Sequence, residues 1–419
     1  MNESSTEPVA SASTNTNSGS NSIVGKSITA SSTAKQKPLP EEMIKNIESV
    51  AATLTDKRKS QRQLFTEHLT SPEQLKSFKA MKPITNIHKA KPAGINSIEM
   101  LPASFNGIGA NLILTGGQDH NAVVSSAIFD NSSSSSTANN NNNNNTLQVK
   151  PLSVLAGHSK AVTCAVFIPS SASIASGSLS SIVTSSVDKT SKIWKSSETV
   201  AGESPTGVGY HLIQTCSGGH TDVITGTAVH PGGNLFITSS LDKCLCYWDI
   251  SSGGKLIHQA FMAYPLTTVQ FHPDGMLFAC CGQEMNNVIT LLDITSGDVA
   301  ETFALFHKDT ISSLAFSENG YHLASGSKDG TVRLYDLRKS KNFHTIDIGH
   351  PVSCVKFDGT GSYLAVVSDS LQTYQLMKGG GCNELMKFSE NIDLTSVAFA
   401  KDSKFLAVTG KDKNLRIYK

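Results

Sequence analysis

Residues 219–248 read GHTDVITGTAVHPGGNLFITSSLDKCLCYW, and this stretch decides the fold. The same order of a His, an apolar run, a Ser or Thr, an Asp and an aromatic residue recurs in residues 158–194 and 307–335. In all three copies the Ser or Thr stands four residues before the Asp, and the aromatic residue stands six residues after it. A unit of this kind, with a period of roughly 40–45 residues, is typical of one four-stranded blade of a β-propeller.

The recurring polar side chains are interpreted as hydrogen-bonded sets inside the blades. The Asp accepts from the His, the His meets the hydroxyl, and the hydroxyl accepts from the Trp N–H, so that each buried polar group is satisfied. The same residue types make a hydrolase triad, but a triad occurs at one site with an oxyanion hole, whereas this set is repeated. We therefore predict no catalytic residue. The sets are His158, Thr184, Asp188 and Trp194; His220, Thr238, Asp242 and Trp248; and His307, Ser325, Asp329 and Tyr335.

Seven units can be counted, although units four, six and seven lack the full set and are expected to rely on packing alone. The prediction is an all-β protein, a seven-bladed WD40 β-propeller over residues 83–419. The units are Ile95–Asp130, Leu152–Lys195, His211–Ile250, Leu256–Ile294, Val299–Leu337, Phe343–Leu376 and Glu384–Tyr418.

The last unit finishes on what would be the third strand of blade seven, residues 415–418 (LRIY). A fourth strand must come from elsewhere, and residues 83–88 (PITNIH) are expected to supply it. Closure of this kind removes the open strand edges that invite aggregation.

Two segments of low complexity are expected to be disordered, because they cannot bury enough apolar surface to offset chain entropy. They are the N-terminal tail, residues 1–38, and a Ser/Asn insert, residues 131–145. A short helical linker is predicted between the tail and the propeller, at residues 39–82. Apolar residues at three- and four-residue spacing indicate a helix over 39–56. The SPEQ sequence at 71–74 resembles a capping box that opens a second, short helix.

Composition narrows the function further. The formal net charge is +1, which argues against salt-driven binding to nucleic acid as the main activity, while direct contact with RNA stays open. None of the eight cysteines forms a C-x-x-C pair, so reduced thiols in an intracellular protein are expected. Cys244 and Cys246 could share one face of a strand, but no His stands at ligand spacing from them, so neither a metal nor another cofactor is predicted.

Binding to other molecules is then the expected role. Several lysines fall on turns between the second and third strands of their blades, on one rim of the predicted ring. The simplest interpretation is an ordinary solvated rim, and a partner-binding rim is kept as the alternative. They are Lys189, Lys243, Lys328, Lys411 and Lys413.

Residues 39–419 also resemble the pre-mRNA-processing factor 19 family. This resemblance is more specific than the general likeness to WD40 repeats. Part of the resemblance lies in the helical linker and part in blade five. The stretches that carry it are PEEMI (40–44), LTDKRK (54–59), SPEQL (71–75), LTGGQDHN (114–121), FHPDG (271–275), ISSLAFSENGY (311–321) and LRKSKNF (337–343).

The resemblance implies a nuclear protein of the NineTeen complex, which activates the spliceosome, and an E3 ubiquitin ligase with a role in DNA-damage responses. Members of the family begin with a catalytic U-box and a tetramerising coiled coil. Residues 1–38 show neither pattern. No catalytic residue is therefore carried over, and a homo-tetramer is expected only if a coiled coil is supplied elsewhere.

The expected function is a protein-binding scaffold, the substrate-receptor part of a splicing-associated ubiquitin ligase. Its expected partners are spliceosomal proteins of the NineTeen complex and ubiquitylation substrates, with no membrane. Two alternatives stay open: an active U-box ligase, if the N-terminus is missing from this chain, and a generic WD40 adaptor of another pathway.

Overall fold

The computed structural model describes residues 38–419, with the exception of 69, 86, 90, 106–107, 130–146, 170–179, 199–207, 284–286, 305, 378, 391 and 401–402. The insert predicted at 131–145 and all of the predicted tail except Pro38 lie outside the described residues. Pro38 itself is buried, and it packs beside Gly297 in the loop after β15 (Ile289–Asp293).

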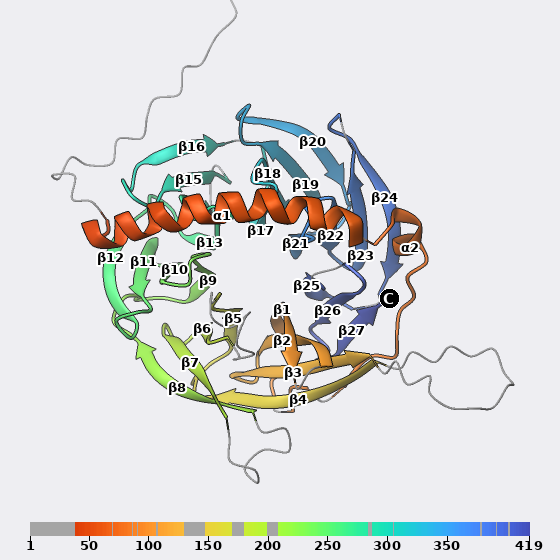
Figure 1. Ribbon diagram of the computed structural model, residues 1–419, viewed down its shortest axis with the longest axis horizontal. Helices are drawn as coiled ribbons and strands as arrows, with labels where there is room; N and C mark the ends of the chain where they lie inside the picture. Colours follow the sequence, from red (N-terminus) through yellow and green to blue (C-terminus); the bar gives the residue numbers. More distant parts are fainter. Residues whose placement is uncertain are drawn as a thin grey trace, which may run out of the picture. The chain divides into compact units, whose positions relative to one another are not determined.

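The described strands form seven antiparallel sheets arranged as blades around an axis, so the predicted seven-bladed WD40 propeller is confirmed (Figure 1). Six blades have four strands in simple up-and-down order, and blade seven has three. Blades one to four are β1 (Ile95–Phe105), β2 (Ile108–Gly117), β3 (Asn121–Phe129), β4 (Leu147–Ala156); β5 (Val162–Phe167), β6 (Ile182–Ser186), β7 (Ser191–Glu198), β8 (Val208–Cys216); β9 (Ile224–Val229), β10 (Leu235–Ser240), β11 (Cys244–Asp249), β12 (Lys255–Phe261); β13 (Leu266–Phe271), β14 (Leu277–Gly282), β15 (Ile289–Asp293), β16 (Val299–Phe303). Blades five to seven are β17 (Ile311–Phe316), β18 (His322–Ser327), β19 (Thr331–Asp336), β20 (Lys341–Asp347); β21 (Cys354–Phe357), β22 (Tyr363–Val367), β23 (Ser370–Leu376), β24 (Cys382–Ser389); β25 (Leu394–Phe399), β26 (Leu406–Gly410), β27 (Leu415–Tyr418).

Burial follows the position of each strand in its blade. Every residue of the middle strands β10 and β11 is buried, because neighbouring blades cover both faces of the sheet. The outermost strand β12 has no buried residue. The apolar clusters accordingly join adjacent blades, as when Leu235 of blade three packs in one cluster with Val269 of blade four. The core is therefore a ring of contacts between blades, and each blade needs its neighbours.

The ring is closed by a segment from before β1. The backbone N–H groups of Lys79, Met81 and Ile84 each donate a hydrogen bond of 2.8 Å to a carbonyl on the outer edge of blade seven, those of Lys419, Ile417 and Leu415. The paired stretch spans residues 79–84, whereas the sequence placed it at 83–88. The shift arises because His88 is used elsewhere, inside blade one.

Two helices precede the strands in the described chain. α1 (Glu41–His68) runs well past residue 56, where the apolar spacing predicted its end. It continues because residues 57–68 contain good helix formers and neither Gly nor Pro. α2 (Pro72–Lys76) begins at the predicted capping box, which is confirmed: Ser71 Oγ accepts from the N–H of Gln74, and the Gln74 side chain accepts from the N–H of Ser71. Neither helix is long and apolar enough to cross a membrane.

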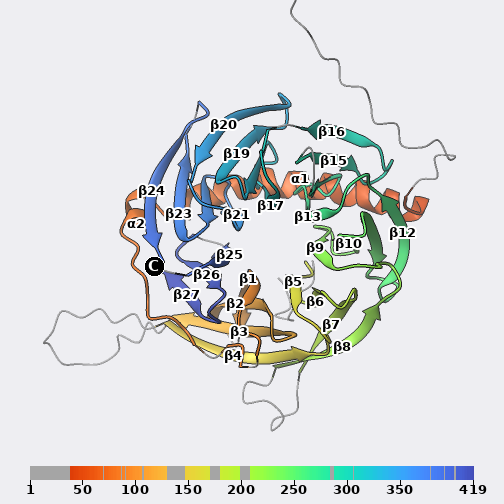
Figure 2. The same ribbon diagram turned by 180° about the vertical axis from the view of Figure 1, so that it is seen from behind.

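α1 lies across one face of the ring, in front of the strands in Figure 1 and behind them in Figure 2. Ile44 and Ile47 are buried in the cluster shared by blades three and four, and the side chain of Arg58 reaches Gly320 in the β17–β18 loop of blade five. We call this side the helix face. The opposite side, which carries the turns between the second and third strands of each blade, is called the turn face.

Candidate functional site

The predicted sets of blades two and three are brought together as complete hydrogen-bonded chains. In blade three, His220 Nδ1 lies 3.0 Å from Asp242 Oδ2, and Nε2 lies 2.7 Å from Thr238 Oγ1. The Trp248 Nε1–H donates to the same hydroxyl over 2.9 Å. Blade two repeats this arrangement with distances of 2.9 Å throughout, through His158, Asp188, Thr184 and Trp194.

Blade five forms the chain only in part. His307 Nδ1 lies 3.1 Å from Asp329 Oδ2, and Nε2 lies 2.6 Å from Ser325 Oγ. The phenol oxygen of Tyr335 is buried but makes no hydrogen bond with the described residues. Its ring packs against Phe303, with 4.7 Å between the ring centroids. Tyr335 therefore contributes packing where Trp contributes a donor.

Blade one holds a fourth set that the sequence analysis missed. His88 Nδ1 lies 2.7 Å from Asp119 Oδ1, and Nε2 lies 2.9 Å from Thr115 Oγ1. A Cβ on Gly117 would lie 2.2 Å from His88 Nδ1, so only glycine fits beside this ring. The spacing of four residues from Thr115 to Asp119 was the available signal. It was masked by Ser125, which stands where the aromatic residue is expected.

The expectation that the degenerate blades rely on packing alone is wrong. In blade seven, the buried Arg416 pairs with Asp412 at 2.6 Å and with Glu390 at 3.2 Å, and the Tyr418 hydroxyl donates to Glu390 over 2.7 Å. Blade four bonds Tyr264 to Thr290, and blade six bonds Tyr374 to Gln372. Each degenerate blade has replaced the histidine set with another satisfied polar pair.

The histidines of the four sets are held neutral. Burial lowers the pKa of each ring below its ordinary value, and the partner Asp offsets only part of that effect. A neutral ring can donate from Nδ1 to the Asp and accept at Nε2 from the hydroxyl. These sets are thus hydrogen-bond networks that fix the blade, with both ring nitrogens occupied. They offer no free general base for chemistry.

A further buried histidine, His230, joins blade three to blade four on the helix face. Its Nδ1 accepts from the N–H of Gly232 at 3.0 Å, and its Nε2–H donates to the carbonyl of Gly275 at 3.1 Å. Burial lowers the pKa of His230 to about 4. In the unfolded chain, His230 is therefore protonated below about pH 6.5, whereas in the folded chain it is protonated only below about pH 4.

This histidine should make the protein sensitive to acid. Between pH 7 and pH 4, the free energy of unfolding is expected to fall by roughly 3 kcal/mol through His230 alone. His230→Asn keeps the acceptor for the turn but cannot be protonated. Urea unfolding measures the free energy of unfolding at both pH values. Its decrease from pH 7 to pH 4 should be smaller in the variant by roughly the same 3 kcal/mol. An equal loss in both proteins would contradict the assignment.

The turns that carry the predicted partner rim lie on the turn face, the side of the ring that faces the viewer in Figure 2. Lys243 and Lys328 are exposed, on the β10–β11 and β18–β19 turns. Lys189 is exposed as well, but its Nζ donates to the carbonyl of Thr221 at 2.6 Å. Lys411 pairs with Asp393 at 2.8 Å, and Lys413 is half-buried. The five lysines therefore share a face, but they are not equivalent.

The same face is hollowed beside blades six and seven. An open hollow of about 590 Å³ is lined by four carboxylates, one lysine and one apolar side chain. Its lining residues are Asp369, Glu390, Ile392, Asp393, Lys411 and Asp412. Lys411 pairs with Asp393, and Arg416 pairs with Asp412 and Glu390, so three of the four carboxylates are in ion pairs. The turn face thus presents isolated lysines over blades two, three and five and a hollow lined mostly by paired carboxylates over blades six and seven.

Comparison with known proteins places this architecture among named families. The family model "WD domain, G-beta repeat" matches residues 149–195 and 211–249, and "Nucleolar protein 10-like, N-terminal domain" matches 245–418. The chain is 33% identical over 362 residues to Pre-mRNA-processing factor 19 of Oryza sativa subsp. japonica, over 83% of this chain and 60% of that protein. It is 32% identical over 382 residues to Pre-mRNA-processing factor 19 of Mus musculus, over 90% of this chain and 66% of that protein.

The chain is a homologue of the pre-mRNA-processing factor 19 proteins. Pre-mRNA-processing factor 19 homolog 2 of Arabidopsis thaliana is 30% identical over 384 residues, over 90% of this chain and 63% of that protein. The chain thus spans less than two thirds of the length of these pre-mRNA-processing factor 19 relatives. The family resemblance of the linker and propeller is confirmed.

Proposed function

We propose that this chain is a protein-binding scaffold in pre-mRNA splicing, and that it binds spliceosomal proteins through the turn face. The observation that carries the proposal is the homology to pre-mRNA-processing factor 19, which extends over 83% to 90% of the chain and includes the propeller. The turn face is free of α1, and it combines exposed lysines with a hollow lined mostly by carboxylates. The histidine sets hold the blades rigid behind it.

We extend the proposal to the substrate-receptor part of a nuclear E3 ubiquitin ligase with a role in DNA-damage responses, as the family resemblance implies. Here the propeller would hold the substrate, and a U-box would recruit the ubiquitin-conjugating enzyme. Ubiquitin transfer by the 419-residue chain alone, with activating and conjugating enzymes supplied, would overturn the receptor assignment in favour of an active ligase.

Affinity purification of the tagged chain from nuclei tests the scaffold. Spliceosomal proteins are expected to co-purify, and the triple variant Lys189→Glu, Lys243→Glu, Lys328→Glu should recover several-fold less of them. Reversed charges on a binding rim repel the partner's complementary charges and slow association. Proteins of an unrelated pathway in place of spliceosomal ones would favour the generic adaptor.

A matched control reverses three charges away from the turn face. Lys45, on α1, and Lys255 and Lys339, near the loops after β11 and β19, are all exposed. Lys45→Glu, Lys255→Glu, Lys339→Glu should leave recovery unchanged. Equal loss in both triple variants would show that overall charge is responsible, and it would count against a turn-face site.

A further inference from the structure

Several blades carry the hydrogen-bonded histidine set in complete or nearly complete form. Blade three differs from the others of this group at two positions of its third strand. Cys244 stands two residues after the turn Asp, where blades two and five have Thr190 and Thr331. Cys246 stands four residues after it, where those blades have Lys192 and Arg333. Cys244 thus replaces a threonine whose hydroxyl lies 3.4 or 3.2 Å from the histidine Nδ1, and Cys246 replaces a long basic side chain.

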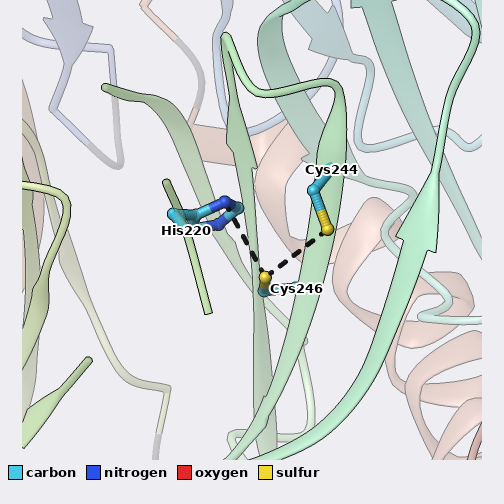
Figure 3. Close-up of side chains that lie close together, drawn as sticks. All are labelled: His220, Cys244 and Cys246. Atoms are coloured by element: carbon cyan, nitrogen blue, oxygen red, sulfur yellow. Dashed lines mark hydrogen bonds between the residues drawn. The ribbon is translucent and has the colours of Figure 1, made fainter. Parts of the chain in front are cut away.

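The fold brings these two sulfurs to the ring of His220 (Figure 3). Cys246 Sγ lies 3.8 Å from His220 Nδ1 and 3.8 Å from Cys244 Sγ. The three donor atoms all lie within 4.8 Å of one another. The sequence analysis saw no histidine at ligand spacing because His220 precedes β9, and only the folding of the blade places it beside β11.

Two of the three separations come close to the edges of a tetrahedral zinc site, and the third, from Cys244 Sγ to His220 Nδ1, is at most 4.8 Å. Zinc–sulfur bonds near 2.3 Å and zinc–nitrogen bonds near 2.0 Å at tetrahedral angles place two sulfurs about 3.8 Å apart and a sulfur and a nitrogen about 3.5 Å apart. We propose that His220, Cys244 and Cys246 bind a zinc ion inside blade three. Two thiolates and one imidazole are a donor set that this ion favours.

The surroundings suit a buried divalent ion. All three side chains are buried, and two thiolates cancel the charge of Zn²⁺, so the complex adds no net charge to the interior. His220 Nε2 faces Thr238 Oγ1 at 2.7 Å, and this contact fixes the ring orientation as outer-shell partners of zinc-bound histidines do. The Gln259 side-chain N–H points to Cys246 Sγ at 3.8 Å, where it can donate to a thiolate.

Binding exchanges one contact for another. His220 Nδ1 must give up its proton, and its bond to Asp242, to take the metal, while Nε2 becomes the protonated nitrogen and donates to Thr238. The Cys244 and Cys246 thiols release their protons as well, so zinc binding is coupled to proton release and weakens in acid. Asp242, with Oδ2 at 3.0 Å from Nδ1, is left beside the site as a neighbouring oxygen donor.

The full chain, refolded from denaturant with zinc and then passed through a mild chelating resin, tests the site. Elemental mass spectrometry should find one zinc ion per chain. Cobalt in place of zinc should give the intense near-ultraviolet band of thiolate-to-cobalt charge transfer. Zinc should also raise the melting temperature, because it binds only the folded state. Absence of the metal or of the thiolate band in the wild-type chain overturns the proposal without recourse to any variant.

Variants locate the ion. The double variant Cys244→Thr/Cys246→Ala places at position 244 the threonine that blades two and five have there. It should bind zinc more than about tenfold more weakly than the wild type. Addition of zinc should not shift its melting temperature. Cys280→Ala/Cys281→Ala removes two buried thiols of the adjacent blade, and should bind zinc as the wild type does. Undiminished binding by the first variant, or loss in the second alone, would place the zinc elsewhere and overturn the assignment.

Discussion

Replacing Ile84 by proline is expected to lower the free energy of unfolding by roughly 2 kcal/mol or more. Ile84 both donates to and accepts from Leu415, at 2.8 and 3.0 Å, and these bonds help to close the ring. Proline has no N–H, and it would leave the Leu415 carbonyl without its partner at the edge of β27. Because every blade is packed between two neighbours, an opened seam weakens blades one and seven together. Urea unfolding measures the loss directly.

Ile84→Val is the matched control, since it keeps the N–H and most of the packing, and it should cost only about 1 kcal/mol. Hydrogen exchange supplies a second measurement: the amide protons of Leu415 and Lys419 should lose protection in the proline variant before those of β10 do. Deletion of the low-complexity residues 1–37 should leave both measurements unchanged. If that deletion destabilises the protein as much as the proline does, the closure has been misassigned.

Asp242→Ala is expected to destabilise blade three by roughly 3 kcal/mol. The carboxylate accepts from His220, from the N–H of Thr221 at 2.8 Å and from the N–H of Cys244 at 2.9 Å. The alanine leaves these three donors without an acceptor, and the His220 side chain is fully buried. Thermal and urea unfolding of the variant should show the loss, together with faster hydrogen exchange in β10 and β11.

Asp222→Ala is the control in the same blade, because within the described part of the chain this exposed Asp accepts just one hydrogen bond, from the N–H of Val223. It should change stability little. Burial alone would raise the pKa of Asp242, but the N–H donors of Thr221 and Cys244, together with His220, hold it below its usual range. Its stabilising effect is therefore complete at neutral pH and is lost as the pH falls through the folded-state pKa. If Asp242→Ala unfolds like the wild type at pH 7, the proposed role of this hydrogen-bond network is refuted.

The fold could be predicted because its unit is repeated. The regular spacing of the Ser or Thr and the Asp marks the turn between the second and third strands of a blade. The number of repeated units then gives the number of blades. The end of α1 could not be predicted in the same way. Apolar spacing marks a helix only where it packs, and residues 57–68 are largely polar. Their helix-forming tendency carries α1 on to His68.

The contacts that sequence reasoning missed join residues distant along the chain. His88 meets Asp119 across β1 and β2, and His220 meets Cys246 across β9 and β10. In each case the partner is chosen by how the blade folds, which spacing alone does not reveal. The rim lysines were found from the turn pattern, but the hollow lined mostly by carboxylates was not, because Asp369 and Asp412 belong to turns of different blades.

The N-terminal helices act as a strut across the ring. Ile47 of α1 is anchored between blades three and four, and Leu75 of α2 is anchored between blades six and seven, so one continuous segment spans blades that do not touch each other. Tension applied to the chain at Pro38 would act first on the side chains of α1 and α2 that are buried between the blades. The backbone hydrogen bonds at residues 79–84 follow these helices along the chain, so they would be loaded only after the buried helix side chains had come away. The propeller can therefore bear tension from its N-terminal side without opening its seam.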